Sequence, residues 1–180
     1  MGRLGKMHAE MLAQDYHSVQ EIRCFSRHAP FDDLANQTPQ VVQCNSFEDA
    51  LKGAEVVITT TTANSPYIET HHIPDDPLLI NLSLMDFTIP VFTDSDIIVD
   101  DWRQCRLAKK VLKDAIDQGL VLQADVHELS DVLYGPMKHK QFPGRTIVNP
   151  LGMALEDISV AWEVYQQVKD STSLPTFEIE

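Results

Sequence analysis

Two glycines at the start of the chain, Gly2 and Gly5, have the spacing that a dinucleotide-binding turn uses. In a Gly-x-Gly-x-x-Gly fingerprint the second glycine lets the backbone approach a pyrophosphate, and the third lets the helix pack on its strand. Free backbone N–H groups and the positive end of the helix then face the phosphates. The expected contacts come from Gly2, Arg3, Leu4 and Gly5. The alternative is an ordinary N-terminal helix with two incidental glycines.

The first strand and first glycine of this fingerprint do not precede Gly2, so we expect the chain to begin inside a nucleotide site. A strand predicted at 21–26 follows at the spacing of a βαβ unit, and Ser26 and Arg27 stand at its carboxyl end. NAD-binding proteins usually carry an acidic residue there for the ribose, whereas an arginine suits a 2′-phosphate. The expected cofactor is therefore NAD or NADP, with a lean toward NADP. Arg27 as a plain surface residue is the alternative.

Small polar residues follow the strand predicted at 55–60, where Thr59, Thr60, Thr61, Thr62 and Ala63 stand in a row. Ligands of open α/β sheets bind at the carboxyl ends of the strands, so these residues are candidates for lining a ligand. β-branched residues also favour strands for their own sake. That alternative suits Thr59 better than Thr61 and Thr62, which already leave the strand.

Asp86 follows the strand predicted at 78–83 by only a few residues. A carboxylate at that edge of the sheet can move a proton to or from a substrate amine. An aspartate that merely forms a turn is the alternative at this point.

The hydrophobic pattern predicts the elements that position these residues. We expect helices at 4–16, 46–53, 103–118, 126–134 and 153–168, strands at 21–26, 41–44, 55–60, 78–83 and 96–100, an extended piece at 146–148, and an irregular connection or weak helix at 28–40. Strands alternating with helices indicate an α/β fold with a Rossmann-type, mainly parallel sheet, its first strand apparently missing, plus a C-terminal helical segment. The predicted division is an incomplete nucleotide-binding domain at 1–118, a helical linker at 119–144 and a C-terminal segment at 145–180.

Composition excludes several classes of protein. The 180 residues are 43% hydrophobic, enough for a core, and their net charge of −13 argues against sequence-independent nucleic-acid binding. Three separated cysteines without a CxxC motif fit neither a disulfide framework nor a zinc site, and no metal is expected. No apolar run reaches the length of a membrane span, and no signal-peptide pattern is visible. These features predict a soluble, cytoplasmic protein that binds neither nucleic acid nor membrane.

Taken in order, these pieces resemble the ornithine cyclodeaminase/mu-crystallin family. The matching stretches span nearly the whole chain and lie at 2–8, 54–63, 65–68, 99–102 and 149–157. The strings Ser-Leu-Met-Asp, Val-Asp-Asp-Trp and Asn-Pro-Leu-Gly-Met-Ala look most like one branch of the family. That branch makes 2,3-diaminopropionate for siderophores from an amino-carboxyethyl glutamate intermediate.

The resemblance implies an NAD(P)-dependent enzyme that acts on an amino acid and works as a homo-oligomer. Hydride leaves the amine-bearing carbon, and the imine is then hydrolysed or attacked internally. Asp86 matches the family's acid/base position. The resemblance also implies that the cofactor-binding set includes Thr60, Thr61, Thr62, Ala63, Leu84, Asn149 and Gly152.

Two departures from the family pattern matter. Met85 stands where the siderophore branch usually has arginine, and Ser26 replaces the ribose-binding acid. The residues that grip the substrate carboxylate, a lysine near the reaction centre and most of the dimer interface belong to the family's upstream half. We therefore expect impaired hydride transfer. The alternatives are a non-catalytic nucleotide-binding remnant or interaction module, and another Rossmann reductase acting on an oxo-acid, in which Asp86 has no special place.

Overall fold

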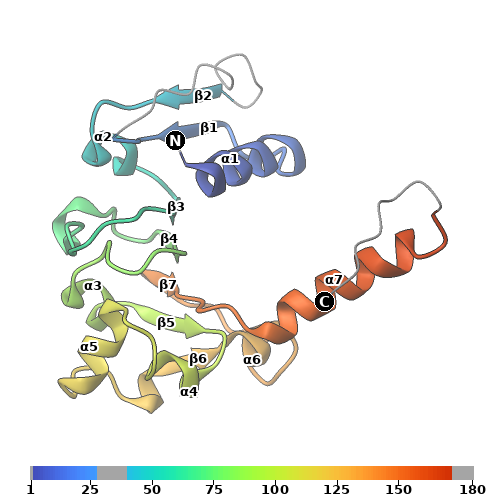
Figure 1. Cartoon of the computed structure of the whole chain (residues 1–180). Helices are drawn as coiled ribbons and strands as arrows, with labels where there is room; N and C mark the ends of the chain where they lie inside the picture. Colours follow the sequence, from blue (N-terminus) through green and yellow to red (C-terminus); the bar gives the residue numbers. More distant parts are fainter. Residues whose placement is uncertain (1, 28–39, 172–180) are drawn as a thin grey trace.

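A computed structural model of the chain describes residues 2–27 and 40–171, in which helices and strands alternate (Figure 1). The strands are β1 (Glu21–Cys24), β2 (Gln40–Gln43), β3 (Val56–Thr59), β4 (Leu78–Asn81), β5 (Asp96–Val99), β6 (Val126–Glu128) and β7 (Thr146–Val148). The α-helices are α1 (Arg3–Asp15), α2 (Phe47–Leu51), α3 (Ile89–Thr93), α4 (Trp102–Cys105), α5 (Val111–Asp117), α6 (Leu129–Leu133) and α7 (Ala154–Val168). Short 3-10 turns lie at Thr70–His72 and Gln123–Asp125. The predicted connection at 28–40 falls almost entirely outside the described residues.

All the strand pairs are parallel within the described residues, which confirms the predicted α/β class. The strands form a two-stranded sheet, β1-β2, and a five-stranded sheet in the order β3-β4-β7-β5-β6. The sequence alone indicates only a brief extended piece at 146–148. In the structure this piece is β7, the central strand, whose Ile147 is completely buried.

The two sheets lie edge to edge with β1 next to β3, but no ladder joins these two strands in the described part of the chain (Figure 1). In the doubly wound order 3-2-1-4-5-6, strand 1 lies between strands 2 and 4. Here β2, β1 and β3 take positions 3, 2 and 4. The place between β1 and β3 therefore corresponds to strand 1 of that order.

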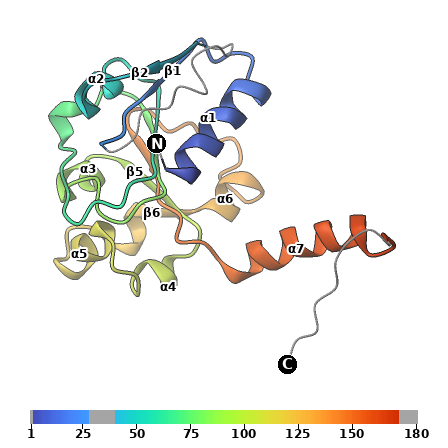
Figure 2. The ribbon, with the colours of Figure 1, turned by 45° about the horizontal axis from the view of Figure 1, so that its top comes forward.

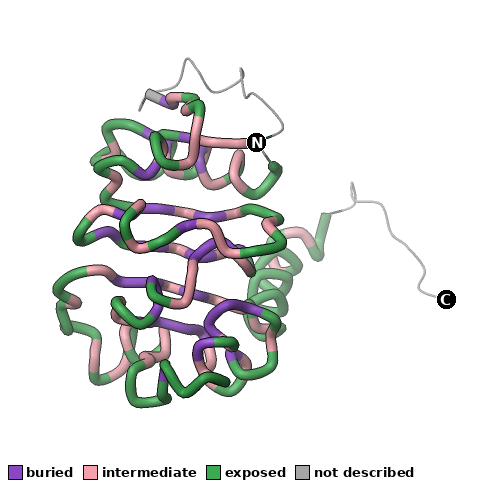
Figure 3. Tube along the Cα trace, turned by 90° about the vertical axis from the view of Figure 1, so that its left-hand side faces the viewer, coloured by how far each residue is buried: buried purple, intermediate pink, exposed green. Residues whose placement is uncertain are grey.

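Helices cover both faces of the layer that the two sheets form, as expected for a doubly wound fold. The helices α2, α3 and α5 lie on one face, and α1 and α6 lie on the other (Figures 1 and 2). Buried residues run along the strands (Figure 3) and make two separate apolar cores. The larger core packs around the five-stranded sheet and includes Leu79, Phe87, Phe92 and Ile97.

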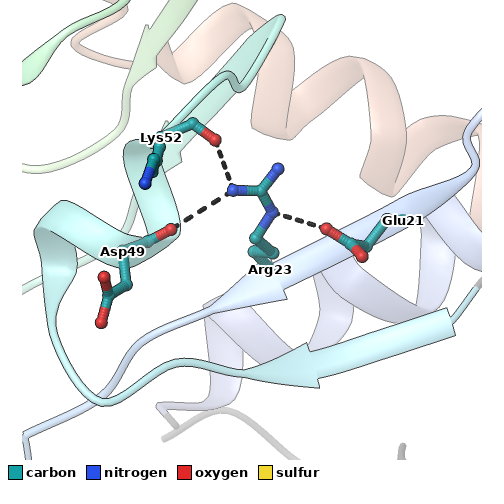
Figure 4. A network of polar contacts seen from close by, with 4 residues as sticks. All are labelled: Glu21, Arg23, Asp49 and Lys52. Atoms are coloured by element: carbon teal, nitrogen blue, oxygen red, sulfur yellow. Dashed lines mark hydrogen bonds and ion pairs between the residues drawn. The ribbon is translucent and has the colours of Figure 1, made fainter.

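The helix α2 begins as the sequence predicts, with Ser46 as its N-cap, and ends at Leu51, two residues before the predicted end. The Ser46 Oγ accepts a hydrogen bond from the Asp49 N–H at 3.1 Å, which caps the first turn. At the other end the guanidinium of Arg23, on β1, donates to the carbonyls of Asp49 and Lys52 and pairs with Glu21 (Figure 4). A cation at the carbonyl end of a helix is stabilising, so Arg23 fastens α2 to the two-stranded sheet.

Two predicted helices differ from the structure. The helix expected at 103–118 is broken into α4 and α5, because Lys110 turns inward and its Nζ donates to the Pro150 carbonyl at 2.6 Å. The helix expected at 126–134 begins instead with the strand β6, whose Val126 pairs with Ile97 of β5. In both places tertiary contacts override a local helical pattern.

The last helix, α7, extends away from the body of the molecule (Figures 1 and 2). None of its fifteen residues is buried, although many are apolar. Exposed side chains include Leu155, Ile158, Val160, Trp162, Val164 and Tyr165. A helix that is apolar over most of its circumference normally lies against other protein.

Candidate active site at the carboxyl edge of the sheet

Three buried polar side chains form a row across the carboxyl edge of the five-stranded sheet. The Thr59 hydroxyl donates to Asn81 Oδ1 at 3.0 Å, and Asn81 Nδ2 donates to Asn149 Oδ1 at 2.6 Å. The row forms because Thr59 and Asn81 are register partners on parallel strands and Asn149 directly follows the next strand, β7. Asn149 is completely buried, yet its Nδ2 has no hydrogen-bond partner. Such a donor is costly unless another group binds it.

Asp86 lies in the loop after β4 and is also completely buried. Its Oδ1 accepts a hydrogen bond from the Thr61 hydroxyl, whereas its Oδ2 has no partner. Thr61 itself is held in place, because its N–H donates to Ser83 Oγ at 2.7 Å and its hydroxyl accepts from the Ala63 N–H at 3.1 Å. The structure thus brings Thr61 and Asp86 into direct contact and leaves one carboxylate oxygen unused.

Tyr67 completes this group from the segment that follows β3. Its N–H donates to the Asp86 carbonyl at 2.9 Å, and its ring packs edge-on against Phe47, with centroids 5.0 Å apart. Burial, followed by the neighbouring charge of Asp86, raises the pKa of Tyr67 to about 12. The phenol therefore stays protonated at neutral pH. Tyr67 stands 19 positions before Asp86, and no local pattern in the sequence links the two residues.

Two charged residues, Asp100 and Lys110, hold the loop that follows β7 through hydrogen bonds to its backbone. The Asp100 Oδ2 accepts hydrogen bonds from the N–H groups of Leu151 and Gly152, at 2.8 and 2.6 Å. Lys110, only 4% exposed, donates to the Pro150 carbonyl. Burial lowers the pKa of Lys110, and the charge of Asp100 opposes that shift. Lys110 was also missed, because a lysine before an apolar helix carries no distinctive sequence signal.

The candidate residues near the end of β3 and β4 are more open to solvent. Thr62 is exposed, Thr60 and Ala63 are half-buried, and Leu84 is 51% exposed. Gly152 has φ +86°, a left-handed conformation that favours glycine. The predicted residues at the ends of β3, β4 and β7 therefore share one edge of the sheet. Buried polar side chains lie beneath residues that are partly exposed.

The remaining candidates belong to the two-stranded part of the molecule. Gly2 is the N-cap of α1, and no side chain caps the first turn of that helix. Its position is open, with no heavy atom within 4 Å of an added Cβ. The start of α1 lies beside the space between β1 and β3 (Figures 1 and 2). Arg3 and Leu4 are exposed and Gly5 is half-buried.

Ser26 and Arg27 follow β1, where Ser26 is half-buried and Arg27 is exposed. The pKa of Tyr67 is raised chiefly by burial and by Asp86, and the Arg27 guanidinium partly offsets this rise.

In the described residues, no cluster of three or more His, Cys, Asp or Glu side chains is arranged to hold a metal ion. In the same part of the chain, no helix has both the length and the apolar character needed to cross a membrane. What the edge offers is a buried carboxylate, hydroxyl donors and an unpaired amide, which suit proton transfer beside a bound organic ligand.

Comparison with known proteins agrees with this arrangement. The family model of the ornithine cyclodeaminase/mu-crystallin family matches residues 1–172. N-((2S)-2-amino-2-carboxyethyl)-L-glutamate dehydrogenase of Staphylococcus aureus (strain NCTC 8325 / PS 47) is 28% identical over 178 residues, covering 93% of this chain and 53% of that protein. The chain thus spans about half the length of this curated relative.

Solved structures show the same fold at low identity. The crystal structure of CmnK superposes with a TM-score of 0.85 at 24% identity, over 99% of this chain and 55% of that one. An archaeal alanine dehydrogenase dimer with bound NAD gives 0.76 at 16% identity, over 99% of this chain and 58% of that one. Because the family model covers almost the entire chain, this protein belongs to the ornithine cyclodeaminase/mu-crystallin family.

Proposed function

We propose that this chain is the NAD(P)-binding and proton-transfer part of an amino-acid dehydrogenase or cyclodeaminase. Its substrate would be an amino acid or an amino-carboxyethyl glutamate, as in the staphylococcal relative. The observation that carries the proposal is Asp86, a fully buried carboxylate with Oδ1 held by Thr61 and Oδ2 unpaired. A carboxylate in this state can accept a proton from a substrate amine as the amine-bearing carbon is oxidised.

The residues present fit a nicotinamide dinucleotide. The uncapped start of α1 offers N–H groups to a pyrophosphate, through Gly2, Arg3, Leu4 and Gly5. Ser26 and Arg27 would meet the adenosine ribose, and the unpaired Asn149 amide suits a carboxamide at the opposite end. The remaining contacts would come from Thr60, Thr61, Thr62, Ala63, Leu84 and Gly152. When bound, the nicotinamide supplies the hydride acceptor.

The chain's own residues then have separate tasks. Thr61 orients the Asp86 carboxylate, and Asp86 removes the proton and later returns it when the imine is hydrolysed or cyclised. Asp100 and Lys110 hold the loop that carries Asn149 and Gly152. The row from Thr59 to Asn149 keeps that edge of the sheet rigid.

The direct test measures binding and turnover on the same sample. NADH and NADPH are titrated against the purified chain by fluorescence, and oxidation of ornithine and of the amino-carboxyethyl glutamate is then assayed. Asp86→Asn is expected to lower turnover about 100-fold to 10,000-fold and to leave cofactor binding unchanged. Asp94→Asn, at an exposed aspartate, is the matched control. Turnover that survives Asp86→Asn rejects the proton-transfer role.

Arg27 provides a test of cofactor preference. Arg27→Ala is expected to weaken NADPH binding more than NADH binding, because a guanidinium pairs with the 2′-phosphate. Arg103→Ala, at an exposed arginine elsewhere, serves as the control. If the unaltered chain binds NADH more tightly than NADPH, the role of Arg27 is rejected.

A non-catalytic nucleotide-binding module is the second candidate. Within the described residues no ladder joins β1 and β3, so these two edges can pair with another segment, which suits an interaction module. Cofactor binding without any turnover would support this candidate over the first.

Self-association belongs to the same proposal. The exposed apolar side chains of α7 suit a second copy of the chain, paired antiparallel. In that orientation Glu156 and Asp157 of one copy lie opposite Lys169 of the other. Light scattering after gel filtration should report a dimer, and Trp162→Glu should convert it to a monomer. Gln167→Glu, on the polar side of the helix, should leave the dimer intact.

A cytoplasmic location completes the proposal. It is supported by the three free thiols Cys24, Cys44 and Cys105. Cell fractionation with a tag on the full chain would check it.

A further inference from the structure

The loop that carries Thr61 has few hydrogen bonds to hold it. It begins directly after β3, and within the described residues no backbone group of 60–66 hydrogen-bonds to another backbone group. The last backbone bond at this end of the strand pair runs from the Leu82 N–H to the Thr59 carbonyl, at 3.1 Å. Thr61 lies two residues further on and is exposed. Because its hydroxyl still donates to Asp86 Oδ1, a contact outside the ladder must fix its backbone.

Ser83 supplies that contact. The Thr61 N–H donates to Ser83 Oγ at 2.7 Å. Thr59 and Asn81 are register partners on β3 and β4, and the two residues of this bond each stand two positions beyond them. The Ser83 hydroxyl therefore takes the place of the backbone carbonyl that would accept the next bond of a parallel ladder. It extends the pairing of the two chain segments as far as Thr61.

Ser83 is itself held firmly, since it is only 4% exposed and both of its neighbours are hydrogen-bonded. Leu82, before it, donates to the Thr59 carbonyl. The carbonyl of Leu84, after it, accepts from the N–H of Val111 at the start of α5, at 3.4 Å. A buried hydroxyl between two fixed neighbours can therefore set the position of the more exposed loop.

The hydrogen bonds form a continuous path from Ser83 to the carboxylate. Ser83 Oγ holds the Thr61 N–H, and the Thr61 hydroxyl donates to Asp86 Oδ1, which leaves Oδ2 without a partner. The Ala63 N–H donates to the same Thr61 hydroxyl oxygen at 3.1 Å, so the hydroxyl hydrogen is directed at the carboxylate. Without the Ser83 bond, the Thr61 backbone is free to move and its hydroxyl to turn away from Oδ1.

We propose that Ser83 is a positioning residue for the reaction, which holds the Thr61 backbone so that the Thr61 hydroxyl stays on Asp86 Oδ1 and Oδ2 faces the substrate amine. This inference rests on the proposed function. In the described residues Ser83 makes no hydrogen bond to Asp86, so it acts through Thr61. Its loss slows proton transfer and leaves the base in place.

The variant that tests this role is Ser83→Ala, which removes one hydroxyl from a small side chain. Ser95→Ala is the matched control, because the Ser95 hydroxyl also bonds to a backbone group, the Val91 carbonyl at 2.6 Å, and Ser95 lies just before β5 at the opposite edge of the sheet. Ser83→Ala should lower kcat about 3-fold to 10-fold, as expected for losing one neutral hydrogen bond. KM and NADH binding should stay unchanged. The control should change none of these quantities.

A double variant shows whether the effect runs through Thr61. Thr61→Val removes the hydroxyl that reaches Asp86 and keeps the N–H that Ser83 binds. If Ser83 acts through Thr61, Ser83→Ala should cause no further loss of kcat in the Thr61→Val background at saturating cofactor. Losses that multiply, or a Ser83→Ala enzyme no slower than the Ser95→Ala control, would overturn the proposal.

Hydrogen exchange tests the contact without any turnover. The Thr61 amide, followed by NMR, should exchange at least about tenfold faster in Ser83→Ala than in the unaltered chain, because it loses its acceptor. Ser95→Ala should leave this rate unchanged. An unchanged rate in Ser83→Ala rejects the contact and the proposal with it. If the rate rises but the unaltered chain shows no turnover, the proposed function fails, and Ser83 is a structural residue only.

Discussion

The two sheets of this molecule differ in how well they support themselves. In the described residues, the five-stranded sheet encloses sixteen buried apolar residues, whereas the core of the two-stranded sheet consists of Ala9, Ala13, Ile22, Cys24 and Val41. Two strands with a small core are marginally stable in water. The larger sheet has helices on both faces and a buried polar row at one edge.

The proposed cofactor site is divided between the two sheets: a firm part lies on the five-stranded sheet and a weak part on the two-stranded sheet. The firm part holds Thr61, Asp86 and Asn149, the groups proposed for the nicotinamide end. The weak part holds Gly2 and Arg27, proposed for the phosphates and the adenosine. The two ends of a bound cofactor would therefore contact different sheets.

Core substitutions, one in each sheet, are expected to give the largest difference in stability between the two sheets. Phe92→Ala, in the larger core, is expected to lower the free energy of unfolding by about 3–5 kcal/mol, because it removes a side chain that is only 1% exposed. Ile22→Ala, in the smaller core, should cost less, since its looser surroundings can collapse. Denaturant unfolding of both variants measures the difference. Equal losses would show that the two cores are equally well packed.

The next largest effect concerns the loop after β7. Asp100→Asn removes the charge from a side chain that accepts two N–H bonds from the loop, and it is expected to cost roughly 1.5–3 kcal/mol. Asp101→Asn is the control, because asparagine caps a helix about as well as aspartate does. Thermal unfolding compares the two variants. If they are equally stable, Asp100 does not hold the loop.

Each core contains one buried thiol, which gives a labelling test. Burial raises the pKa of Cys24 to about 11 and that of Cys105 to about 12, so at pH 8 each thiol reacts only after local opening. Cys24 should be labelled at least about tenfold faster, since opening the smaller sheet costs less. Mass spectrometry after timed alkylation gives both rates. Faster labelling of Cys105 would reverse the proposed ranking.

The same thiols predict how stability depends on pH. The unfolded chain ionises each cysteine near pH 9, while the folded chain holds it neutral until about pH 11 or 12. The stability that these buried thiols contribute is therefore fully present below pH 9. It is lost as the pH rises through their folded-state pKa values. Cys105→Ala should flatten the decline more than Cys44→Ala does. Denaturant midpoints between pH 8 and 11 measure it.

The smallest expected effect comes from Arg23, which ties α2 to the two-stranded sheet (Figure 4). Its side chain is 32% exposed, so Arg23→Met should cost only about 0.5–1.5 kcal/mol. The loss should appear as faster hydrogen exchange in β1 and β2, with β4 and β7 unchanged. Equal acceleration in both sheets would mean that they unfold together.

Local patterns determined a large share of the fold. Short Val- and Ile-rich runs marked β1 to β5, and Ser46 marked the start of α2, because apolar periodicity and capping act within a few residues. The family, the parallel sheet and the candidate positions Thr61, Asp86 and Asn149 were likewise read from short strings of sequence.

Only the tertiary structure decided the rest. Three residues of β7 became the centre of a sheet because strands distant in sequence paired on both of its edges. Val126 joined a strand and Lys110 broke a helix, since long-range pairing and burial outweighed local propensity. The contact of Tyr67 with Asp86 depends on how two loops fold together, and no local spacing in the sequence encodes that approach.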